Sequence, residues 1–436
     1  MNDNCEVKVI GAGLAGCEAA YQLANRGIRV RLIDMKPAKL TPAHKSASFC
    51  ELVCSNSLRS DNIENAVGLL KEELRRMGSL IMECADRTRV PAGGALAVDR
   101  EGFSALVTEK IKSCDLISVE SAEVTEVPEA PCIIATGPLT DGPLLESIER
   151  IAGTALHFHD AAAPIVTKES LDMDKVFVCS RYDRGSDYLN CPMNAEEYFR
   201  FIRELVKAET VELHDFETPR VFEGCMPVET MAKRGDMTLA YGPLKPVGLI
   251  DPRTGKQPFA VVQLRQDNEA GTLYNIVGFQ TNLKFPEQRR VFGLIPGLEK
   301  AEYIRYGVMH RNSYMESPAK LTPWYELRSR EYTFFAGQLT GVEGYIESAS
   351  SGFVAGVNMA RKLKGLDPVD FEASTAVGAL GHYVSEYNGS DFQPMNVTFG
   401  IMEPLKDPPR NKRARYAEIA KSSLARVFEL TEKGEI

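Results

Sequence analysis

The chain has 436 residues, of which 44% are hydrophobic and 25% are charged, and its formal net charge at pH 7 is −9. This composition excludes intrinsic disorder, and the length predicts two domains. The negative charge argues against a globally basic nucleic-acid-binding protein but leaves room for a local basic patch. There is no run of about 18 apolar residues and no secretory leader pattern, so we expect a cytoplasmic protein without a membrane span.

The first 34 residues have the pattern of a β-α-β unit. An apolar strand at 7–10 leads directly into the glycine-rich turn 11–16. Apolar residues then recur at helical spacing as far as Asn25-Arg26-Gly27, a run that indicates the end of a helix. A second apolar strand, 28–33, ends at Asp34.

Later elements continue the alternation of strand and helix. In chain order we predict helices at 66–84 and 103–112, strands at 116–119, 131–136 and 332–336, and a helix at 348–363. Between about residue 153 and residue 307 the composition changes, because aromatic, proline and β-branched residues become more frequent, as in 258–264 and 273–279. This change is typical of a separate α+β domain inserted into a nucleotide-binding domain.

The turn 11–16 is a GxGxxG motif between a strand and a helix. Gly11 makes the tight turn, Gly13 lets the backbone approach a pyrophosphate at the helix N-terminus, and Gly16 allows close packing of helix on strand. Asp34 is placed to accept hydrogen bonds from ribose hydroxyls. The motif predicts a dinucleotide site formed by Gly11, Ala12, Gly13, Leu14, Ala15, Gly16 and Asp34.

Two later segments favour FAD over NAD as the dinucleotide. The strand that ends in Ala135-Thr136-Gly137 resembles a segment of FAD-binding Rossmann proteins. The run Phe335-Ala336-Gly337-Gln338, with glycines further on, resembles their C-terminal flavin segment. There is no second GxGxxG motif for a resident NAD(P)H. We therefore expect Thr136, Gly137, Gly337 and Gln338 to complete an FAD site.

These observations together predict an α/β fold with a discontinuous Rossmann-type FAD-binding domain and an inserted α+β domain. We expect residues 1–150 to form the first part of the FAD domain and 151–305 to form the inserted domain. Residues 306–436 then form the second part, which carries a basic C-terminal segment.

The ten cysteines include no CxxC pair, so we expect reduced thiols rather than a zinc ribbon. Two of them lie in loops. Cys54 lies in the polar loop 51–60, and Cys225 lies between a glycine and a proline, where a helix cannot run. Lys233 and Arg234 follow Cys225 and favour a thiolate if they fold nearby. From the residues alone, two ordinary loop thiols are the simpler alternative.

Three further features have alternatives that the sequence leaves open. His157 and His159 flank Phe158, but no third ligand is spaced with them, so we expect no metal site. The segment 405–426 carries seven basic residues and two acidic ones, a net +5, and is either an RNA phosphate contact or a solvated helix face. Tyr345 either stacks on the flavin ring or a base, or packs in the core.

The motifs taken together resemble the folate- and FAD-dependent tRNA uracil-5-methyltransferase family over essentially the whole chain. The segments that carry the resemblance are 11–16, 51–60, 91–100, 223–227, 231–235, 306–312 and 335–344. A related FAD-binding enzyme, which modifies the tRNA wobble uridine, shares the flavin segments but has a long extra C-terminal helical region. We expect this chain to be without that region.

The resemblance implies a methyltransferase reaction in tRNA processing. Methylenetetrahydrofolate supplies a one-carbon unit through flavin N5, reduced FAD supplies electrons that come from NADH or NADPH, and C5 of the T-loop uridine 54 of tRNA receives the methyl group. Uracil C5 is a poor nucleophile until a thiolate adds to C6. By resemblance Cys225 is this nucleophile, and Cys54 is a second functional cysteine that stabilises or protects the flavin-bound intermediate.

Three rival functions remain open at the level of sequence. The first is the same chemistry on ribosomal RNA, because substrate choice depends on surface contacts. The second is a flavin oxidoreductase of a small metabolite without an RNA partner. The third is a flavoprotein that binds RNA as a folding aid and catalyses nothing.

Overall fold

The computed structural model describes residues 6–41, 43–153, 155–181, 187–211, 226–389 and 392–436, with backbone alone at 156–160, 310 and 311. Its centre is a five-stranded sheet in which every neighbouring pair is parallel. In spatial order the strands are β16 (Thr333–Phe335), β7 (Cys132–Ile134), β1 (Glu6–Ile10), β2 (Arg29–Asp34) and β6 (Ile117–Ser121). All five come from the two flanking parts of the chain, as the sequence predicted.

The predicted β-α-β unit is confirmed: β1, helix α1 (Leu14–Asn25) and β2 follow one another, and the two strands pair in parallel. Gly11 makes the turn between β1 and α1 with φ of +98°, a conformation that favours glycine. A Cβ atom at Gly16 would overlap the carbonyl oxygen of Gly11. The helix therefore begins against the strand at a distance that only glycine allows.

Helix α10 (Tyr345–Leu363) packs along α1 and is almost entirely buried. Two glycines of α10 make this approach possible. A Cβ atom at Gly352 would overlap the carbonyl oxygen of Ala15, and one at Gly356 would lie 2.7 Å from the carbonyl oxygen of Ala19. The N-terminal motif and the C-terminal flavin segment, more than 300 residues apart in the sequence, are thereby held against each other.

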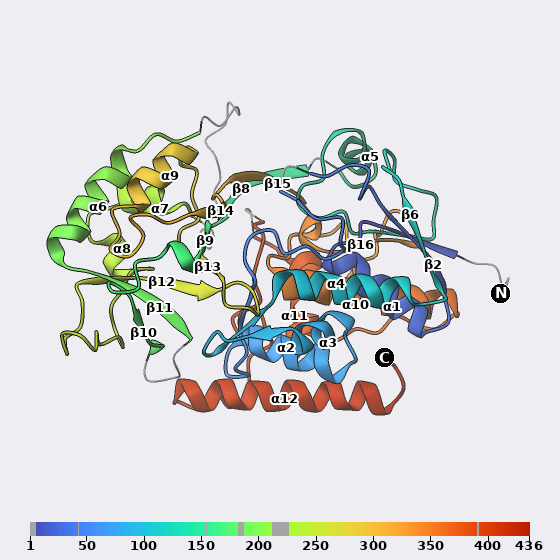
Figure 1. Cartoon of the computed structure of the whole chain (residues 1–436). Helices are drawn as coiled ribbons and strands as arrows, with labels where there is room; N and C mark the ends of the chain where they lie inside the picture. Colours follow the sequence, from blue (N-terminus) through green and yellow to red (C-terminus); the bar gives the residue numbers. More distant parts are fainter. Residues whose placement is uncertain (1–5, 42, 154, 182–186, 212–225, 390–391) are drawn as a thin grey trace.

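The remaining helices of the flanking parts pack around the parallel sheet, and the last of them lies near the C-terminus (Figure 1). The helix predicted at 66–84 is two helices, because Gly78 has φ of +78° and Ser79 caps a new start by accepting from the Met82 amide at 3.2 Å. The bounds are α2 (Ala66–Arg76), α3 (Leu80–Arg87), α4 (Arg100–Lys112), α5 (Gly142–Ala152), α11 (Ala376–Glu386) and α12 (Lys412–Glu432). A small sheet of β3 (Ser57–Ser60), β5 (Ala95–Val98) and β4 (Arg89–Val90) lies beside them.

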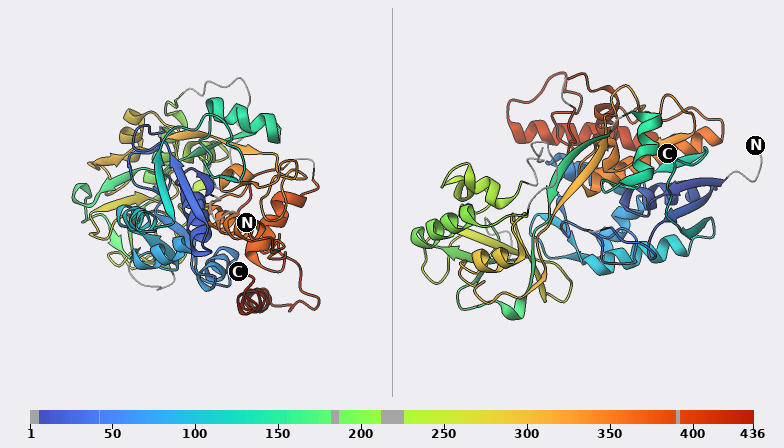
Figure 2. Two further views of the ribbon diagram at one scale, coloured as in Figure 1. Left: turned by 90° about the vertical axis from the view of Figure 1, so that its right-hand side faces the viewer. Right: turned by 90° about the horizontal axis from the view of Figure 1, so that it is seen from above.

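Two antiparallel strands, β8 (Ala155–Ala161) and β15 (Met309–Met315), carry the chain out to the middle region and back (Figure 2). Beyond them is a six-stranded antiparallel sheet with the spatial order β10-β11-β12-β13-β9-β14. Its strands are β9 (Ile165–Thr167), β10 (Phe177–Val178), β11 (Tyr188–Met193), β12 (Ala260–Gln266), β13 (Leu273–Ile276) and β14 (Tyr303–Arg305). Its helices are α6 (Ala195–Lys207), α7 (Val228–Lys233), α8 (Thr238–Tyr241) and α9 (Phe285–Phe292), with short 3₁₀ turns at Lys168–Ser170 and, in the flanking part, Gln338–Thr340.

The described residues form two main hydrophobic cores. One gathers buried residues from Val7 to Ala152 and from Tyr314 to Leu430, and the other gathers residues from Val166 to Leu298. These cores are the physical basis of the division that we propose, in which 1–150 and 306–436 flank an inserted domain at 151–305. Among the described helices, none has the length and apolar character needed to cross a bilayer.

The contact between α1 and α10 generates a stability prediction. Gly352→Ala should lower the free energy of unfolding by about 1–3 kcal/mol, because the added methyl group forces the two helices apart. Urea unfolding followed by circular dichroism measures this change. Gly400→Ala is the matched control, since its Cβ atom meets only Thr398 Oγ1 at 3.5 Å. Equal stability of the two variants would contradict the close packing described above.

Candidate functional site

A cavity of about 890 Å³ opens at the edge of the parallel sheet where its strands end. Cavity-lining residues at or just after the ends of the five strands are Gly11, Asp34, Ala122, Thr136 and Gly337. This edge is where open α/β sheets bind ligands, because loops after parallel strands leave a crevice there. The volume lies in the range of small-molecule and cofactor sites.

The glycine-rich turn forms one wall of the cavity at the N-terminus of α1. Gly13 is the N-cap residue, and no side chain caps the helix there. A Cβ atom at Gly13 would meet no atom within 4 Å, so this face of the turn is open. Helix N-termini attract anions through their unpaired amides and the helix dipole. The turn can therefore hold a phosphate group against backbone alone.

Asp34 also lines the cavity, and its carboxylate holds the backbone of the motif in place. Its Oδ2 accepts a hydrogen bond from the Ala12 amide at 2.6 Å, and its Oδ1 accepts from the Lys36 amide at 2.9 Å. Ala12 itself is buried and, like Gly16, does not line the cavity. These two predicted residues shape the turn, while Gly11, Gly13, Leu14 and Ala15 face the open space.

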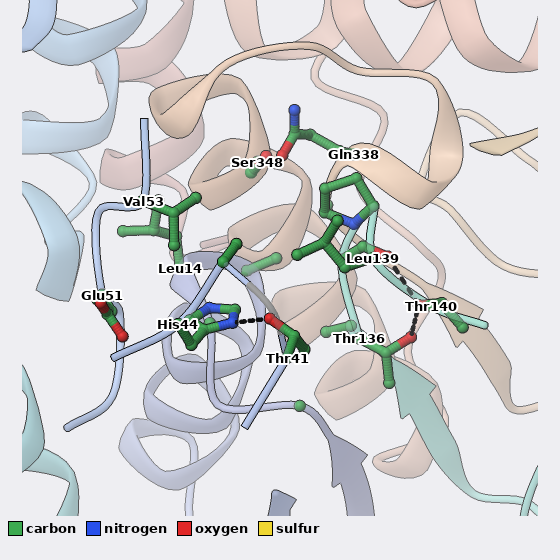
Figure 3. Close-up of a pocket in the computed structure, with 18 of the residues that line it drawn as sticks. Leu14, Thr41, His44, Glu51, Val53, Thr136, Leu139, Thr140, Gln338 and Ser348 are labelled. Carbon is green, nitrogen blue, oxygen red and sulfur yellow. Dashed lines mark hydrogen bonds between the residues drawn. The ribbon is translucent and has the colours of Figure 1, made fainter. Parts of the chain in front are cut away.

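The two later flavin segments close over the same cavity (Figure 3). Thr136 accepts a hydrogen bond from the Thr140 hydroxyl at 2.7 Å. The Gly337 amide donates to Ser351 Oγ at 2.7 Å, and Gln338 donates from Nε2 to Glu343 Oε1 at 2.8 Å. The three segments that the sequence predicted separately as parts of the FAD site thus line one cavity.

A polar wall that includes Thr41 and His44 was not predicted as part of the site, and Glu51, from the predicted loop 51–60, lies in the same wall. His44 pairs with Thr41 through Nδ1 and Oγ1 at 2.6 Å, as Figure 3 shows. Burial, with a smaller effect from the Lys36 ammonium, lowers the pKa of His44. Glu51 accepts from the backbone amides of Lys45 and Ser46. The residues of this loop have no regular periodicity, so the sequence held no signal for their position.

Cys54 lies in the same cavity, half-buried, beside the start of α10. Its backbone amide donates to the Tyr345 hydroxyl at 2.8 Å, and the Ser55 amide donates to the same oxygen at 3.3 Å. Burial raises the pKa of Tyr345. Tyr345 therefore acts as a neutral hydrogen-bond acceptor that ties the cysteine loop to the flavin segment, in addition to lining the cavity.

Cys225 lies outside the described residues. The described chain resumes at Met226, and the Val228 amide donates to the Gln280 carbonyl at 2.7 Å. Gln280 lines the cavity. Lys233 ends helix α7, which starts at Val228. The segment that follows Cys225 in the sequence is thus anchored beside the cavity wall.

Two charged residues, Arg59 and Glu347, also line the cavity. Glu347 is 1% exposed and accepts from Arg59 Nη1 at 2.9 Å. Burial raises the pKa of Glu347, while the Arg59 guanidinium opposes that shift. Arg59 has φ of +68°, an uncommon conformation for a residue with a side chain. Strained backbone of this kind accumulates at functional sites.

Comparison with solved structures shows the fold. Two crystal forms of GidA from Aquifex aeolicus align with TM-scores of 0.65 and 0.66 over 99% and 98% of this chain, and over 76% and 78% of theirs. Sequence identity is 16% in both cases, so the likeness concerns the fold. The fold and the cavity together define a Rossmann-type FAD-binding protein with an inserted α+β domain.

Comparison with sequences then shows the family. The family model described as "Glucose inhibited division protein A" matches residues 6–367. The methylenetetrahydrofolate–tRNA-(uracil-5-)-methyltransferase TrmFO of Acetivibrio thermocellus is 61% identical over 98% of this chain and 99% of its own. The TrmFO of Ligilactobacillus salivarius is 57% identical over 97% of each chain. The chain belongs to this methyltransferase family, within the broader group that includes GidA.

The residues present fit an FAD molecule. The open backbone at Gly13 and the helix N-terminus suit a pyrophosphate, and the Asp34 carboxylate suits a ribose. The glycine turn and the segment at Gly337 and Gln338 line the same cavity. Within the described part of the chain, no cluster of histidine, cysteine, aspartate or glutamate has the geometry of a metal site.

The open face at Gly13 generates the second prediction. Gly13→Val should give folded protein that is largely colourless, because the side chain enters the space of the pyrophosphate without touching other protein atoms. Flavin absorbance per mole of purified protein measures the loss.

Gly16→Val is the contrasting variant for this test. Its side chain would overlap the Gly11 carbonyl oxygen, so it should fail to fold rather than fold without flavin. Full flavin occupancy in a folded Gly13→Val protein would show that the pyrophosphate does not lie at this turn.

Proposed function

We propose that this protein is a methylenetetrahydrofolate–tRNA-(uracil-5-)-methyltransferase that forms 5-methyluridine at the T-loop uridine 54 of tRNA. The observation that supports it best is the shared cavity: the glycine turn, the two flavin segments and the Cys54 loop line one space. The near full-length identity to proteins that carry this name supports the reaction class. FAD when bound supplies the electrons for the reaction, with NADH or NADPH as their source.

We propose two roles for the cysteines. Cys225 is the nucleophile that adds to uracil C6, which makes C5 able to attack a one-carbon electrophile. Cys54 is the second functional cysteine, placed at the cavity wall by its backbone bond to Tyr345. Val228, three residues after Cys225 in the sequence, is anchored to the cavity-lining Gln280.

Mass spectrometry of RNA is the direct test of the substrate. A strain that lacks the protein should have tRNA without 5-methyluridine at position 54, and the purified enzyme with methylenetetrahydrofolate and a reductant should restore it. Loss of 5-methyluridine from ribosomal RNA alone would establish the rival RNA substrate. Unchanged RNA in the deletion strain would favour a flavin oxidoreductase of a small metabolite.

The roles of the thiols generate the third prediction. Cys225→Ala should keep its flavin and its RNA affinity but make almost no 5-methyluridine, because no thiolate is left to add to C6. The wild-type enzyme should form a covalent adduct with T-loop RNA that contains 5-fluorouridine, since fluorine cannot leave as the proton does. The adduct, seen as a shifted band on a denaturing gel, should vanish in Cys225→Ala.

Cys54→Ala is the matched cysteine variant for this experiment. It should retain the capacity for the adduct while losing turnover. An adduct that persists without Cys225 and disappears without Cys54 would reverse the two roles. Normal methylation by both variants would exclude a covalent thiol mechanism in this protein.

We further propose that the basic segment 405–426, which includes the first part of α12, contacts tRNA phosphates. Helix α12 lies at the outside of the molecule against α2 (Figure 1). Lys412 and Arg413 are exposed, and Arg413 forms an ion pair with Glu64 at 2.9 Å. Exposed ion pairs of this kind are weak, so phosphates can compete for the guanidinium.

This proposal generates the fourth prediction. Neutralising Lys412, Arg413 and Arg415 together should weaken tRNA binding and lower the slope of log Kd against log salt by roughly 0.7–0.9 for each phosphate that is no longer neutralised. Filter binding between low and moderate salt measures the slope. The matched control neutralises three exposed basic residues on another helix, Arg200, Arg203 and Lys207 of α6. An unchanged slope in the first variant would remove α12 from the RNA site.

A further inference from the structure

The loop that carries Cys54 is held by a side chain from the inserted sheet. Arg265 on β12 donates from Nη2 to Ser55 Oγ at 2.6 Å and from Nε to Asn56 Oδ1 at 3.2 Å. Asn56 is fully buried and donates in turn to the Gln266 carbonyl at 2.9 Å and to the Val98 carbonyl at 3.0 Å. The two residues that follow Cys54 are therefore fastened to β12 as well as to Tyr345.

Arg265 is an unusual residue for fastening a loop, because it is a buried cation. It is 8% exposed, lines the cavity and forms no ion pair within the described part of the chain. The nearby carboxylate, Asp267, is already paired with Arg100 at 2.9 Å. Burial lowers the pKa of Arg265, although a guanidinium remains charged at neutral pH. A buried cation without a paired carboxylate is costly even when it is hydrogen-bonded, so a structural role alone accounts poorly for it.

The charged groups around the Cys54 thiol indicate a functional role for the Arg265 cation. Three guanidinium groups from three elements interact electrostatically with the thiol: Arg100 on α4, Arg265 on β12 and Arg305 on β14. The Asp267 carboxylate neutralises one of these charges by pairing with Arg100.

The other two cations form no ion pair among the described residues, although Asp267 interacts electrostatically with Arg265 and the Glu51 carboxylate with Arg305. Arg305 is buried and bonds the Ala43 carbonyl at 3.3 Å, and it forms no ion pair among the described residues. Tyr345, on α10, faces the thiol as a neutral phenol because burial raises its pKa. The surroundings of Cys54 thus carry a net positive charge, and such surroundings favour a thiolate over a thiol.

We propose that Arg265 is a positioning residue for Cys54: it fastens the cysteine loop to the inserted domain and holds its sulfur as a thiolate at neutral pH. Arg305 supports the same ionisation without touching the loop after Cys54. The inference rests on the proposed function only in placing Cys54 in the active site. It gives the inserted domain a direct role in the chemistry of a cysteine that belongs to the other domain.

The first test uses the wild-type flavoprotein. Its Cys54 is alkylated with iodoacetamide at a series of pH values, and the rate is read from the mass of the peptide that contains Cys54. The midpoint should lie well below the ordinary thiol value of about 8.5. Cys84 is an internal control, because burial raises its pKa to about 12 and it should stay unreactive over the range. A Cys54 midpoint at or above the ordinary value would overturn the proposal.

The second test changes the charge. Arg265→Gln should raise the Cys54 midpoint by roughly one pH unit, because one buried positive charge beside the sulfur is removed. Arg265→Lys keeps the charge and should stay near the wild-type midpoint. A Lys variant that shifts as far as the Gln variant, or a Gln variant that does not shift, would contradict the electrostatic role.

Two further variants serve as controls for these measurements. Arg253→Gln removes a cation that pairs with Asp251 elsewhere in the inserted domain and should leave the midpoint unchanged. Arg305→Gln removes the second charge without touching Ser55 or Asn56, so it should raise the midpoint even if Arg265→Gln does not fold. No shift in Arg305→Gln would overturn the electrostatic account. The covalent adduct at Cys225 is scored separately, so the failure of one proposal is distinguishable from the failure of the other.

Discussion

The close approach of helix α1 to its neighbours is the constraint on which the rest of the molecule depends. Gly16 lies against the carbonyl of Gly11, and Gly352 of α10 lies against the carbonyl of Ala15. Any side chain at these positions would separate the helix from the sheet or from α10. Because these contacts fix the position of α1 against the sheet, its N-terminus opens onto the edge where the parallel strands end. The cavity exists at that edge for this reason.

Buried carboxylates hold the outer helices to this frame. Glu18 accepts from the amides of Leu80 and Ile81 at the start of α3, and Glu73 accepts from Ala376 and Val377 at the start of α11. In both cases a carboxylate satisfies amides that have no partner within their own helix. Burial nevertheless raises the pKa of both groups, that of Glu73 to about 7. The caps thus bury two ionisable groups whose charged forms are disfavoured by burial, and they fix the positions of α3 and α11.

The inserted domain completes the cavity rather than standing apart from it. Strands β8 and β15 leave and return at its rim, where Ala161 and Asn312 line it. Gln280 and Arg265 reach it from the inserted part. Residues of the flanking parts and of the inserted part therefore meet around a single space. A substrate that contacts the inserted domain would therefore also reach the part of the cavity that the flavin segments line.

The sequence by itself determined the local elements and the dinucleotide motif. Gly11, Gly13 and Asp34 have their roles within one β-α-β unit, whose contacts are close along the chain, so the pattern of residues was sufficient. The flavin segments at Thr136 and Gly337 were found in the same way, since each follows a buried strand. The break at Gly78 was missed because a positive φ depends on the surrounding packing as well as on the glycine.

Only the tertiary structure decided what surrounds Cys54. Arg265 lies about 210 residues away in an apolar strand, and its side chain carries no local sign that it points at a cysteine loop. From two further elements, Tyr345 accepts from the Cys54 amide and Arg305 interacts electrostatically with the Cys54 thiol. Contacts of this kind come from the pairing of strands and helices that are distant in sequence. Their positions follow from how the two cores pack, which no local pattern of residues encodes.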